Sequence, residues 1–303
     1  MNTQTILHLL SGNELSAKAI THLLTLAAEV KHEPLRYHSL LAHKHIALLF
    51  DKPSLRTRMS FITAIHRLGG HAIESHAHTR KTEAPKDLIR VLQNYCDGIM
   101  FRTHDDHILH EMCEYAEIPV INGLSKLYHP CQTLADLFTL QQYFGHLSGL
   151  RIAYIGDGNN VLHSLLLMTN KLNITVHYCC PSAYQPSPQV LALLSNPQLV
   201  RAYTSPTQAV NDCDAVYTDV WTSMGCAQHD ETMFEGYQVN HALMNNAAPN
   251  AIFMHCMPME RGKEVSDALA DDPRSVIFQQ SANRLYVQQA WLIQLFKPNV
   301  ELN

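Results

Sequence analysis

Two short segments carry side chains that could bind a small anion and polarise a carbonyl group. Residues 54–58 read Ser-Leu-Arg-Thr-Arg and stand where a helix is expected to begin. Free N–H groups at a helix start and guanidinium groups both bind phosphate. Residues 129–132 read His-Pro-Cys-Gln and follow an expected strand. Together the segments fit a ligand with phosphate at one end and an amide at the other, which is the composition of carbamoyl phosphate.

The phosphate end of such a ligand would be bound by hydroxyl and guanidinium groups. Ser54 and Thr57 can donate from their hydroxyls, and Arg56 can bind phosphate through two N–H groups. Arg102 follows the next expected strand and would add a second cation. The alternative is a helix with Ser54 as its N-cap and arginines on its surface.

The carbonyl end would be bound by His129 and Gln132. The imidazole can donate to the carbonyl oxygen, and the glutamine can accept from the amide. A donor placed at a developing oxyanion typically contributes roughly 3–4 kcal/mol. The alternative is a packed histidine beside a glutamine that caps a helix.

Further polar residues follow strands in the second half of the chain. An amino-acid substrate needs a carboxylate for its ammonium group and donors for its own carboxylate, and Asp219 and Asn160 suit these roles. Cys256 has no evident base beside it, so we do not interpret it as a covalent nucleophile. The alternative for Cys256 is a small buried apolar side chain at a strand end.

Strand and helix patterns alternate along the whole chain, which predicts parallel sheets with helices on both faces. We expect the α/β class, with two doubly wound parallel-sheet domains joined by interdomain helices. The expected domains are residues 1–145 and 146–282, with the terminal helix 283–303 packing back onto the first. Since ligands bind beyond the carboxyl ends of parallel strands, polar groups from both halves would face one cleft. Apolar runs typical of strands lie at 46–50, 98–101, 119–121, 151–155, 174–179, 215–218 and 251–254.

Composition narrows the function classes. The 303 residues carry 22 basic and 27 acidic side chains, a net charge of −5, which disfavours general nucleic-acid binding. We expect no signal peptide and no membrane span, because no segment has the required apolar length. The eight cysteines are scattered and contain no CxxC pair, which predicts reduced thiols and a cytoplasmic protein.

Cofactor signatures are weak. The 20 histidines lack an HExxH motif, and although His107 and His110 would share a helix face, we expect no metal site. Residues 156–161 read Gly-Asp-Gly-Asn-Asn-Val, so Val161 stands where a dinucleotide fingerprint has its third glycine. No acidic residue ends the next strand and no Walker loop occurs, so we expect no cofactor.

Taken together, these motifs resemble those of the aspartate/ornithine transcarbamoylase family over nearly the whole chain, in the family's order. Its carbamoyl phosphate motif is similar to residues 54–58, its His-Pro-x-Gln to 129–132, and its paired asparagines to Asn159 and Asn160. Its Asp-x-x-x-Ser-Met-Gly loop corresponds to 219–225 and its His-Cys-Leu-Pro to 255–258. The Ser-Met-Gly loop points to the ornithine branch of the family.

The resemblance implies roles for individual residues. Catalysis is expected at Cys256, Arg102, His129 and Asp219. The ornithine-binding residues would be Asn160, Asp219, Ser223 and Met224. The carbamoyl phosphate-binding residues would be Ser54, Leu55, Arg56, Thr57, His78, Arg102, His129, Gln132, Cys256, Met257 and Arg284.

Three positions depart from the family pattern. Leu55 replaces a threonine, which removes one hydroxyl. Ala282 replaces a glutamate beside Arg284, so another group must orient that arginine. His78 stands at the expected position of a glutamine that reaches the phosphate from a neighbouring subunit.

The implied reaction transfers the carbamoyl group of carbamoyl phosphate to the side-chain amine of L-ornithine, with arginine biosynthesis as the favoured context. The resemblance also implies a homotrimer or a multiple of trimers. Alternatives are another acceptor amine such as putrescine, the catabolic direction, a non-catalytic regulator on the same scaffold, and an NAD-dependent dehydrogenase.

Overall fold

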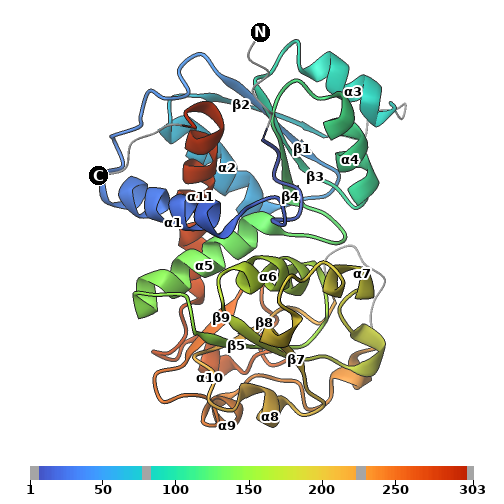
Figure 1. Ribbon diagram of the computed structural model, residues 1–303, viewed down its shortest axis with the longest axis vertical. Coiled ribbons are helices and arrows are strands. Elements are labelled where there is room, and N and C mark those ends of the chain that lie inside the picture. The colour runs from blue at the N-terminus through green and yellow to red at the C-terminus, as the bar shows by residue number, and fades with distance from the viewer. Residues whose placement is uncertain (1–6, 77–82, 223–229, 299–303) are drawn as a thin grey trace. The chain divides into compact units, whose positions relative to one another are not determined.

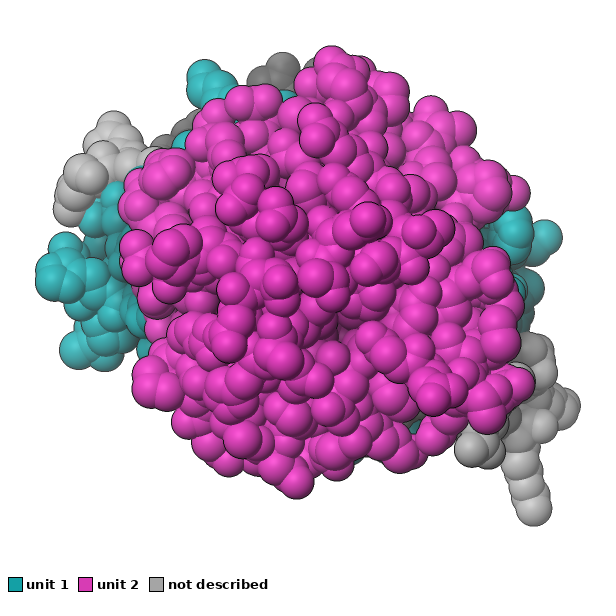
Figure 2. Space-filling view, turned by 90° about the horizontal axis from the view of Figure 1, so that it is seen from below, with its two compact units in different colours: residues 1–134, 284–303 teal, residues 135–283 magenta. Residues whose placement is uncertain are grey.

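The computed structural model describes residues 7–76, 83–222 and 230–298 (Figure 1). The chain forms two compact units, coloured separately in Figure 2. Unit 1 comprises residues 1–134 and 284–303, and unit 2 comprises residues 135–283. Helices α5 (Pro130–Phe144) and α11 (Ile277–Phe296) each begin in one unit and end in the other. No described helix has the length and apolarity that a membrane span requires.

Unit 1 is built on a four-stranded parallel sheet with the order β2-β1-β3-β4. Strands β1 and β3 are almost wholly buried, as expected for central strands covered on both faces. The strands are β1 (His45–Phe50), β2 (His71–His76), β3 (Gly98–Arg102) and β4 (Val120–Leu124). The helices that lie wholly in this unit are α1 (Ala17–His32), α2 (Leu55–Arg67), α3 (Pro85–Leu92) and α4 (Asp106–Tyr115).

Unit 2 contains a five-stranded parallel sheet with the order β7-β6-β5-β8-β9. The strands are β5 (Arg151–Ile155), β6 (Thr175–Cys179), β7 (Val200–Ala202), β8 (Ala215–Thr218) and β9 (Ile252–His255). The α-helices are α6 (Asn160–Lys171), α7 (Pro188–Leu191), α8 (Pro206–Val210), α9 (His241–Met244) and α10 (Asp267–Ala270). The 3-10 helices are η1 (Ser182–Tyr184), η2 (Pro197–Leu199) and η3 (Glu231–Phe234).

These two parallel sheets, covered by helices, confirm the predicted α/β class with doubly wound parallel-sheet domains. In each sheet the chain order reverses at one point, between β1 and β3 in unit 1 and between β5 and β8 in unit 2. Ligands of open α/β sheets bind at such switch points, beyond the carboxyl ends of the strands. Ser54 follows β1 and Arg102 ends β3, while Asn160 and Asp219 follow β5 and β8. The topology of each unit therefore brings its polar residues to its own switch point.

Candidate active site

Ser54 occupies the N-cap position of α2, but its side chain does not cap the helix. Its Oγ instead accepts a hydrogen bond of 3.1 Å from Nη1 of Arg102. This corrects the alternative in which Ser54 serves as an ordinary cap, because the neighbouring strand end supplies a stronger, charged donor. The first N–H groups of α2 therefore receive no bond from this hydroxyl.

Thr57 is the centre of the polar cluster in unit 1. Its hydroxyl is buried in the first turn of α2 and accepts from Arg284 Nη2 at 3.1 Å and from Arg102 Nη1 at 3.5 Å. Two guanidinium groups from distant parts of the chain thus converge on one side chain. Their positive charges add to the partial positive charge of the α2 N-terminus, which makes this cluster suited to phosphate.

Arg284 is held in place by a second contact, from its Nη1 to Oε1 of Gln132 at 3.0 Å. The family glutamate that Ala282 replaces is therefore not needed to orient this arginine, since Gln132 and Thr57 do so. Gln132 lies in the first turn of α5, and its N–H donates to the carbonyl oxygen of His129. The His129-Pro-Cys-Gln segment and the 54–57 segment accordingly meet through Arg284.

His129 is buried beside these arginines. Burial, followed by the charges of Arg284 and Arg102, holds its pKa well below the usual range. A neutral imidazole can donate a hydrogen bond to a carbonyl oxygen without carrying a charge of its own. This electrostatic setting suits the polarising role that the sequence predicts for His129.

Residues 55, 56 and 58 differ in their exposure and in their contacts with other side chains. Leu55 is 70% exposed, and Arg56 is partly exposed and has no hydrogen bond or ion pair with the residues that the structure describes. Arg58 instead forms an ion pair of 2.8 Å with Glu74 of β2. Of the two arginines in the motif, Arg56 is therefore the one whose guanidinium is available to a ligand.

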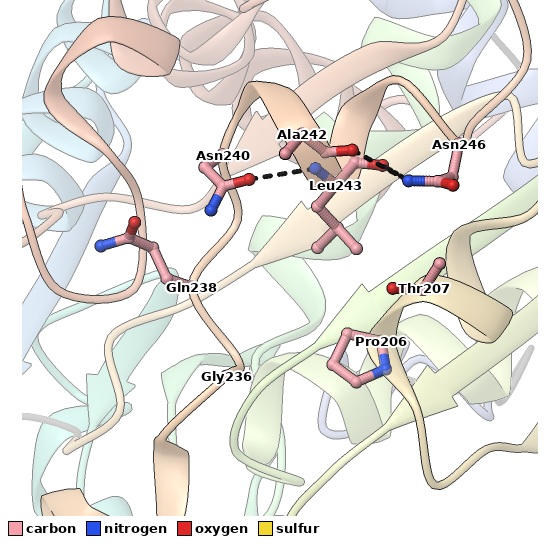
Figure 3. Close-up of a pocket in the computed structure, with 8 residues that line it drawn as sticks. All are labelled: Pro206, Thr207, Gly236, Gln238, Asn240, Ala242, Leu243 and Asn246. Carbon is pink, nitrogen blue, oxygen red and sulfur yellow. Dashed lines mark hydrogen bonds between the residues drawn. The ribbon is translucent and has the colours of Figure 1, made fainter.

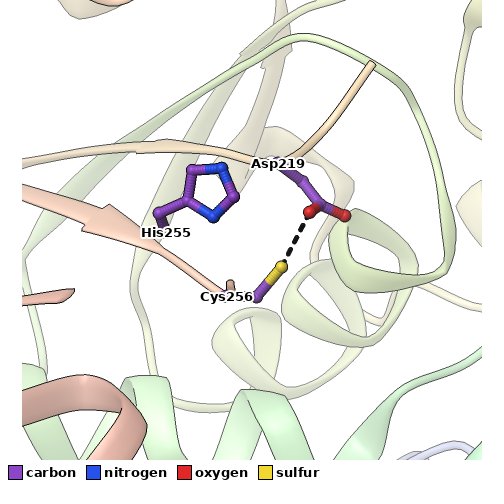
Figure 4. Close-up of side chains that lie close together, drawn as sticks. All are labelled: Asp219, His255 and Cys256. Atoms are coloured by element: carbon purple, nitrogen blue, oxygen red, sulfur yellow. Dashed lines mark hydrogen bonds between the residues drawn. The ribbon is translucent and has the colours of Figure 1, made fainter. Parts of the chain in front are cut away.

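In unit 2, Asp219 and Cys256 lie in direct contact (Figure 4). The thiol of Cys256 donates to Oδ1 of Asp219 at 2.8 Å, and the N–H of Val220 donates to the same oxygen at 2.8 Å. Asp219 follows β8 and Cys256 follows β9, which are neighbours in the sheet. Sequence reasoning named both residues but saw no partner for Cys256, because the contact joins positions far apart in the chain.

Asn159 also contacts Asp219 and was missing from the predicted site residues. Its Nδ2 donates to Asp219 Oδ2 at 2.7 Å, while its Oδ1 caps α6 by accepting from the N–H groups of Val161 and Leu162. The sequence signal was the paired-asparagine match at Asn159 and Asn160, of which only Asn160 was given a role. Asn160 follows as the first residue of α6 and is buried.

Asp157 lies in the same loop, between β5 and α6. Burial, followed by the negative charge of Asp219, raises its pKa to about 7. Perturbed carboxyl groups of this kind gather at functional sites, although structural groups show them too. Both carboxyl groups, Asp157 and Asp219, are buried.

Among the described residues, Asp219, His255 and Cys256 form the only cluster with side-chain atoms close enough to share a metal ion. However, both ring nitrogens of His255 are occupied. Nδ1 accepts from the N–H of Met257 at 2.9 Å, and Nε2 lies 3.1 Å from Oε1 of the buried Glu264. Two ligand atoms would remain, which is fewer than a structural zinc site requires.

His78, Ser223 and Met224 lie outside the described residues, so their predicted roles stay predictions. Met257 has a left-handed backbone, with φ of 59°, directly after Cys256.

A pocket in unit 2 lies between α8 and α9 and has a volume of about 360 Å³ (Figure 3). Its side chains are uncharged, and several of its amides are already engaged. Gln238 donates to the carbonyl oxygens of Gly262 and Lys263, and Asn240 caps α9. The pocket therefore lacks the cations that a phosphate needs, and it contains none of the predicted site residues.

Two family models together match most of this chain. The family model described as "Aspartate/ornithine carbamoyltransferase, carbamoyl-P binding domain" matches residues 7–142, and its "Asp/Orn binding domain" counterpart matches residues 148–295. An ornithine carbamoyltransferase of Methanocorpusculum labreanum is 41% identical over 297 residues, covering 94% of this chain and 97% of the relative. One from Thermococcus kodakarensis is 43% identical, with 84% of each chain covered.

Solved structures of ornithine carbamoyltransferases also align with most of this chain. The ornithine carbamoyltransferase of Pyrococcus furiosus aligns with a TM-score of 0.90 at 39% identity, covering 97% of this chain and 98% of that one. The Gloeobacter violaceus ornithine carbamoyltransferase aligns with a TM-score of 0.87 at 41% identity, covering 95% and 98%. On the strength of both family models and these full-length relatives, the chain belongs to the aspartate/ornithine carbamoyltransferase family.

Proposed function

We propose that this protein is an ornithine carbamoyltransferase, which converts carbamoyl phosphate and L-ornithine into L-citrulline and phosphate. The observation that carries the proposal is the convergence of Arg102 and Arg284 on Thr57 beside the α2 N-terminus. Such an arrangement provides charge-assisted donors for a phosphate group. The names of the relatives favour ornithine as the acceptor.

Carbamoyl phosphate would bind to unit 1. Its phosphate would receive hydrogen bonds from Arg56, Arg102, Ser54 and Thr57, and the α2 N-terminus would add its N–H groups. Its carbonyl oxygen would accept from neutral His129, and its amide would donate to Gln132. The remaining family-derived contacts are assigned to Leu55, His78 and Arg284 of the same unit, and to Cys256 and Met257, which belong to unit 2. We assign this role to a domain of residues 1–145 with the terminal helix 283–303.

Ornithine would bind to a domain of residues 146–282. Asp219 would accept from its α-ammonium group, and Asn160, Ser223 and Met224 would hold its α-carboxylate. Asp219 is buried and already accepts from Asn159 and Cys256, so it is fixed before the substrate arrives. A fixed carboxylate avoids the entropic cost of ordering a flexible one.

In the reaction, the neutral side-chain amine attacks the carbamoyl carbon, and a tetrahedral intermediate expels phosphate. The amine nitrogen forms the new C–N bond and loses one proton. The phosphate oxygen that leaves takes the electron pair of the broken C–O bond and, overall, that proton, so the product is hydrogen phosphate. Arg56 and Arg102 stabilise the charge on the departing phosphate. Alignment of two substrates can itself supply roughly 7–11 kcal/mol. Asp219 and Cys256 assist the amine in binding and losing its proton.

We further propose a cytoplasmic homotrimer, or a multiple of trimers, working in arginine biosynthesis. Large apolar side chains on adjacent elements of unit 1 support self-association: Leu55 and Met59 of α2 are 70% and 55% exposed, and Ile73 of β2 is 44% exposed. A Pyrococcus furiosus relative named as the anabolic enzyme is 42% identical over 266 residues, which favours the biosynthetic direction.

The decisive test incubates the purified protein with carbamoyl phosphate and L-ornithine and measures citrulline and phosphate. The proposal predicts equal amounts of both products and no transfer to putrescine, which lacks an α-carboxylate. Transfer to putrescine at a comparable kcat/KM, or no transfer to either amine, would refute the proposed acceptor.

A further inference from the structure

We propose that Asp136 is a positioning residue that fixes the Asp219–Cys256 contact by joining the ends of strands β8 and β9. Its carboxylate binds one group connected to each strand. The inference rests on the proposed function only for its kinetic consequence, because its structural consequence is measurable on the thiol of Cys256.

The first connection runs to β8. Asp136 lies on α5 and is fully buried, and its Oδ2 accepts from the hydroxyl of Tyr217 at 3.0 Å. Tyr217 is also fully buried and precedes Asp219 by two residues on β8. The hydroxyl–carboxylate bond therefore fixes this strand close to the point where Asp219 leaves it.

The second connection runs to β9 through Gln280 of α11. Nε2 of Gln280 donates to Asp136 Oδ1 at 2.7 Å, and its Oε1 accepts from the N–H of His255 at 2.9 Å. His255 immediately precedes Cys256. Only one orientation of the amide satisfies both bonds, so the carboxylate determines how Gln280 holds the end of β9.

Burial makes these bonds difficult to replace. Asp136, Tyr217, Gln280 and His255 all have 0% exposure. A buried donor or acceptor that loses its partner costs about 1–3 kcal/mol, because water cannot take the partner's place. Strands β8 and β9 pair with Thr218 opposite His255, so the next residues of the two strands are Asp219 and Cys256. Fixing the ends of both strands thereby fixes the 2.8 Å thiol–carboxylate contact.

A neighbouring contact between the same two helices supplies a matched control. One turn further along α5, the hydroxyl of Thr139 accepts from Nδ2 of Asn283 at 2.9 Å. Thr139 is as buried as Asp136. Among the described residues, the Thr139 hydroxyl bonds to Asn283 and to the carbonyl oxygen of Ala135, neither of which lies on β8 or β9. Thr139→Val therefore removes an α5–α11 bond without releasing either strand end.

The experiment measures alkylation of Cys256 by iodoacetamide in the full-length protein, followed by peptide mass spectrometry. Cys113, also partly buried but located on α4 of unit 1, serves as an internal reference in every sample. The thiolate is the reactive form, and the bond to Asp219 keeps the proton on sulfur. Gln280→Met should therefore raise the alkylation rate of Cys256 about threefold or more, without a change at Cys113.

Tyr217→Phe releases strand β8 and should also raise the alkylation rate of Cys256. It also keeps the test decisive if Gln280→Met does not fold. Asp136→Asn should retain a near-normal rate, because its oxygen can still accept from Gln280 and its amide can donate to Tyr217. Thr139→Val should lower the thermal midpoint but leave the Cys256 rate unchanged.

Unchanged Cys256 alkylation in Gln280→Met and Tyr217→Phe would overturn the proposal, as would an equal rise in Thr139→Val. Kinetics provide the second readout, in which the ornithine KM should rise about tenfold in Gln280→Met with little change in the carbamoyl phosphate KM. If alkylation responds as expected but even the wild type forms no citrulline, the positioning role stands and the proposed function fails.

Discussion

Arg284 donates from Nη2 to the hydroxyl of Thr57 across 227 positions of the chain. Both residues belong to unit 1, because the terminal part of α11 is part of that unit. The contact brings the end of α11 to the first turn of α2, where the Thr57 hydroxyl also accepts from Arg102. It also explains how Arg284 keeps its orientation although Ala282 replaces the family's glutamate.

Arg56→Ala should reduce turnover at least about a thousandfold, which corresponds to roughly 4 kcal/mol of transition-state stabilisation. The guanidinium of Arg56 has no partner among the described residues, so its loss removes only ligand contacts. Steady-state kcat measurements would check this. Arg58→Ala is the matched control, because Arg58 pairs with Glu74 at a partly exposed site and should cost less than about tenfold. Near-native turnover of Arg56→Ala would place the phosphate site elsewhere.

Leu55→Thr should lower the carbamoyl phosphate KM by about three- to tenfold, because one added hydrogen bond contributes roughly 0.5–1.5 kcal/mol. Leu55 is 70% exposed, so the change should affect the free energy of unfolding by less than about 0.5 kcal/mol. Leu55→Ala separates the hydroxyl from the loss of bulk. An equal fall in KM for Leu55→Ala would mean that the hydroxyl is not responsible.

Asp219→Asn should raise the ornithine KM by about a hundredfold while changing carbamoyl phosphate binding less than about twofold. The variant removes the charge that balances the substrate ammonium, and it disturbs only unit 2 contacts, those with Asn159, Val220 and Cys256. Initial velocities with each substrate varied in turn would measure both constants. Equal damage to the two constants would contradict the division of roles between the domains.

Asp157→Asn should change how stability depends on pH. The pKa of Asp157 is raised from 3.8 to about 7 by burial and then by Asp219. The folded state therefore binds more protons than the unfolded state between these values, and the free energy of unfolding falls as pH rises through this window. Asparagine does not ionise, so the Tm of the variant relative to wild type should be higher at about pH 8 than at about pH 5 by a few degrees. A difference in Tm that is the same at both pH values would show that Asp157 does not titrate in this way.

Local patterns predicted much of the fold. The apolar run 46–50 became β1, and the helix expected to begin within residues 54–58 became α2, which ends at Arg67. At Gly69, φ is +82° and an added Cβ would lie 2.6 Å from the carbonyl oxygen of His38, so glycine is required there. Three-residue β7 and four-residue α10 were missed, because so few residues carry no detectable periodicity.

The site was predictable in its residue types but not in its contacts. Ser54, Arg102 and Asp219 could be named because each follows or ends a strand. The bonds from Arg102 to Ser54 and from Cys256 to Asp219 join residues 48 and 37 positions apart, and no local pattern encodes such pairs. Asp136 and Gln280 escaped notice for the same reason, since their importance comes only from what they touch.

In the proposed function, the cations of unit 1 and the carboxylate of unit 2 bind the two substrates of one reaction. The most direct measurement is calorimetric titration with a bisubstrate compound, a phosphonoacetyl group joined to the side-chain amine of L-ornithine. We expect the wild type to bind it at least about a hundredfold more tightly than either substrate alone, and both Arg102→Ala and Asp219→Asn to lose most of that affinity. Full affinity in either variant would contradict the account.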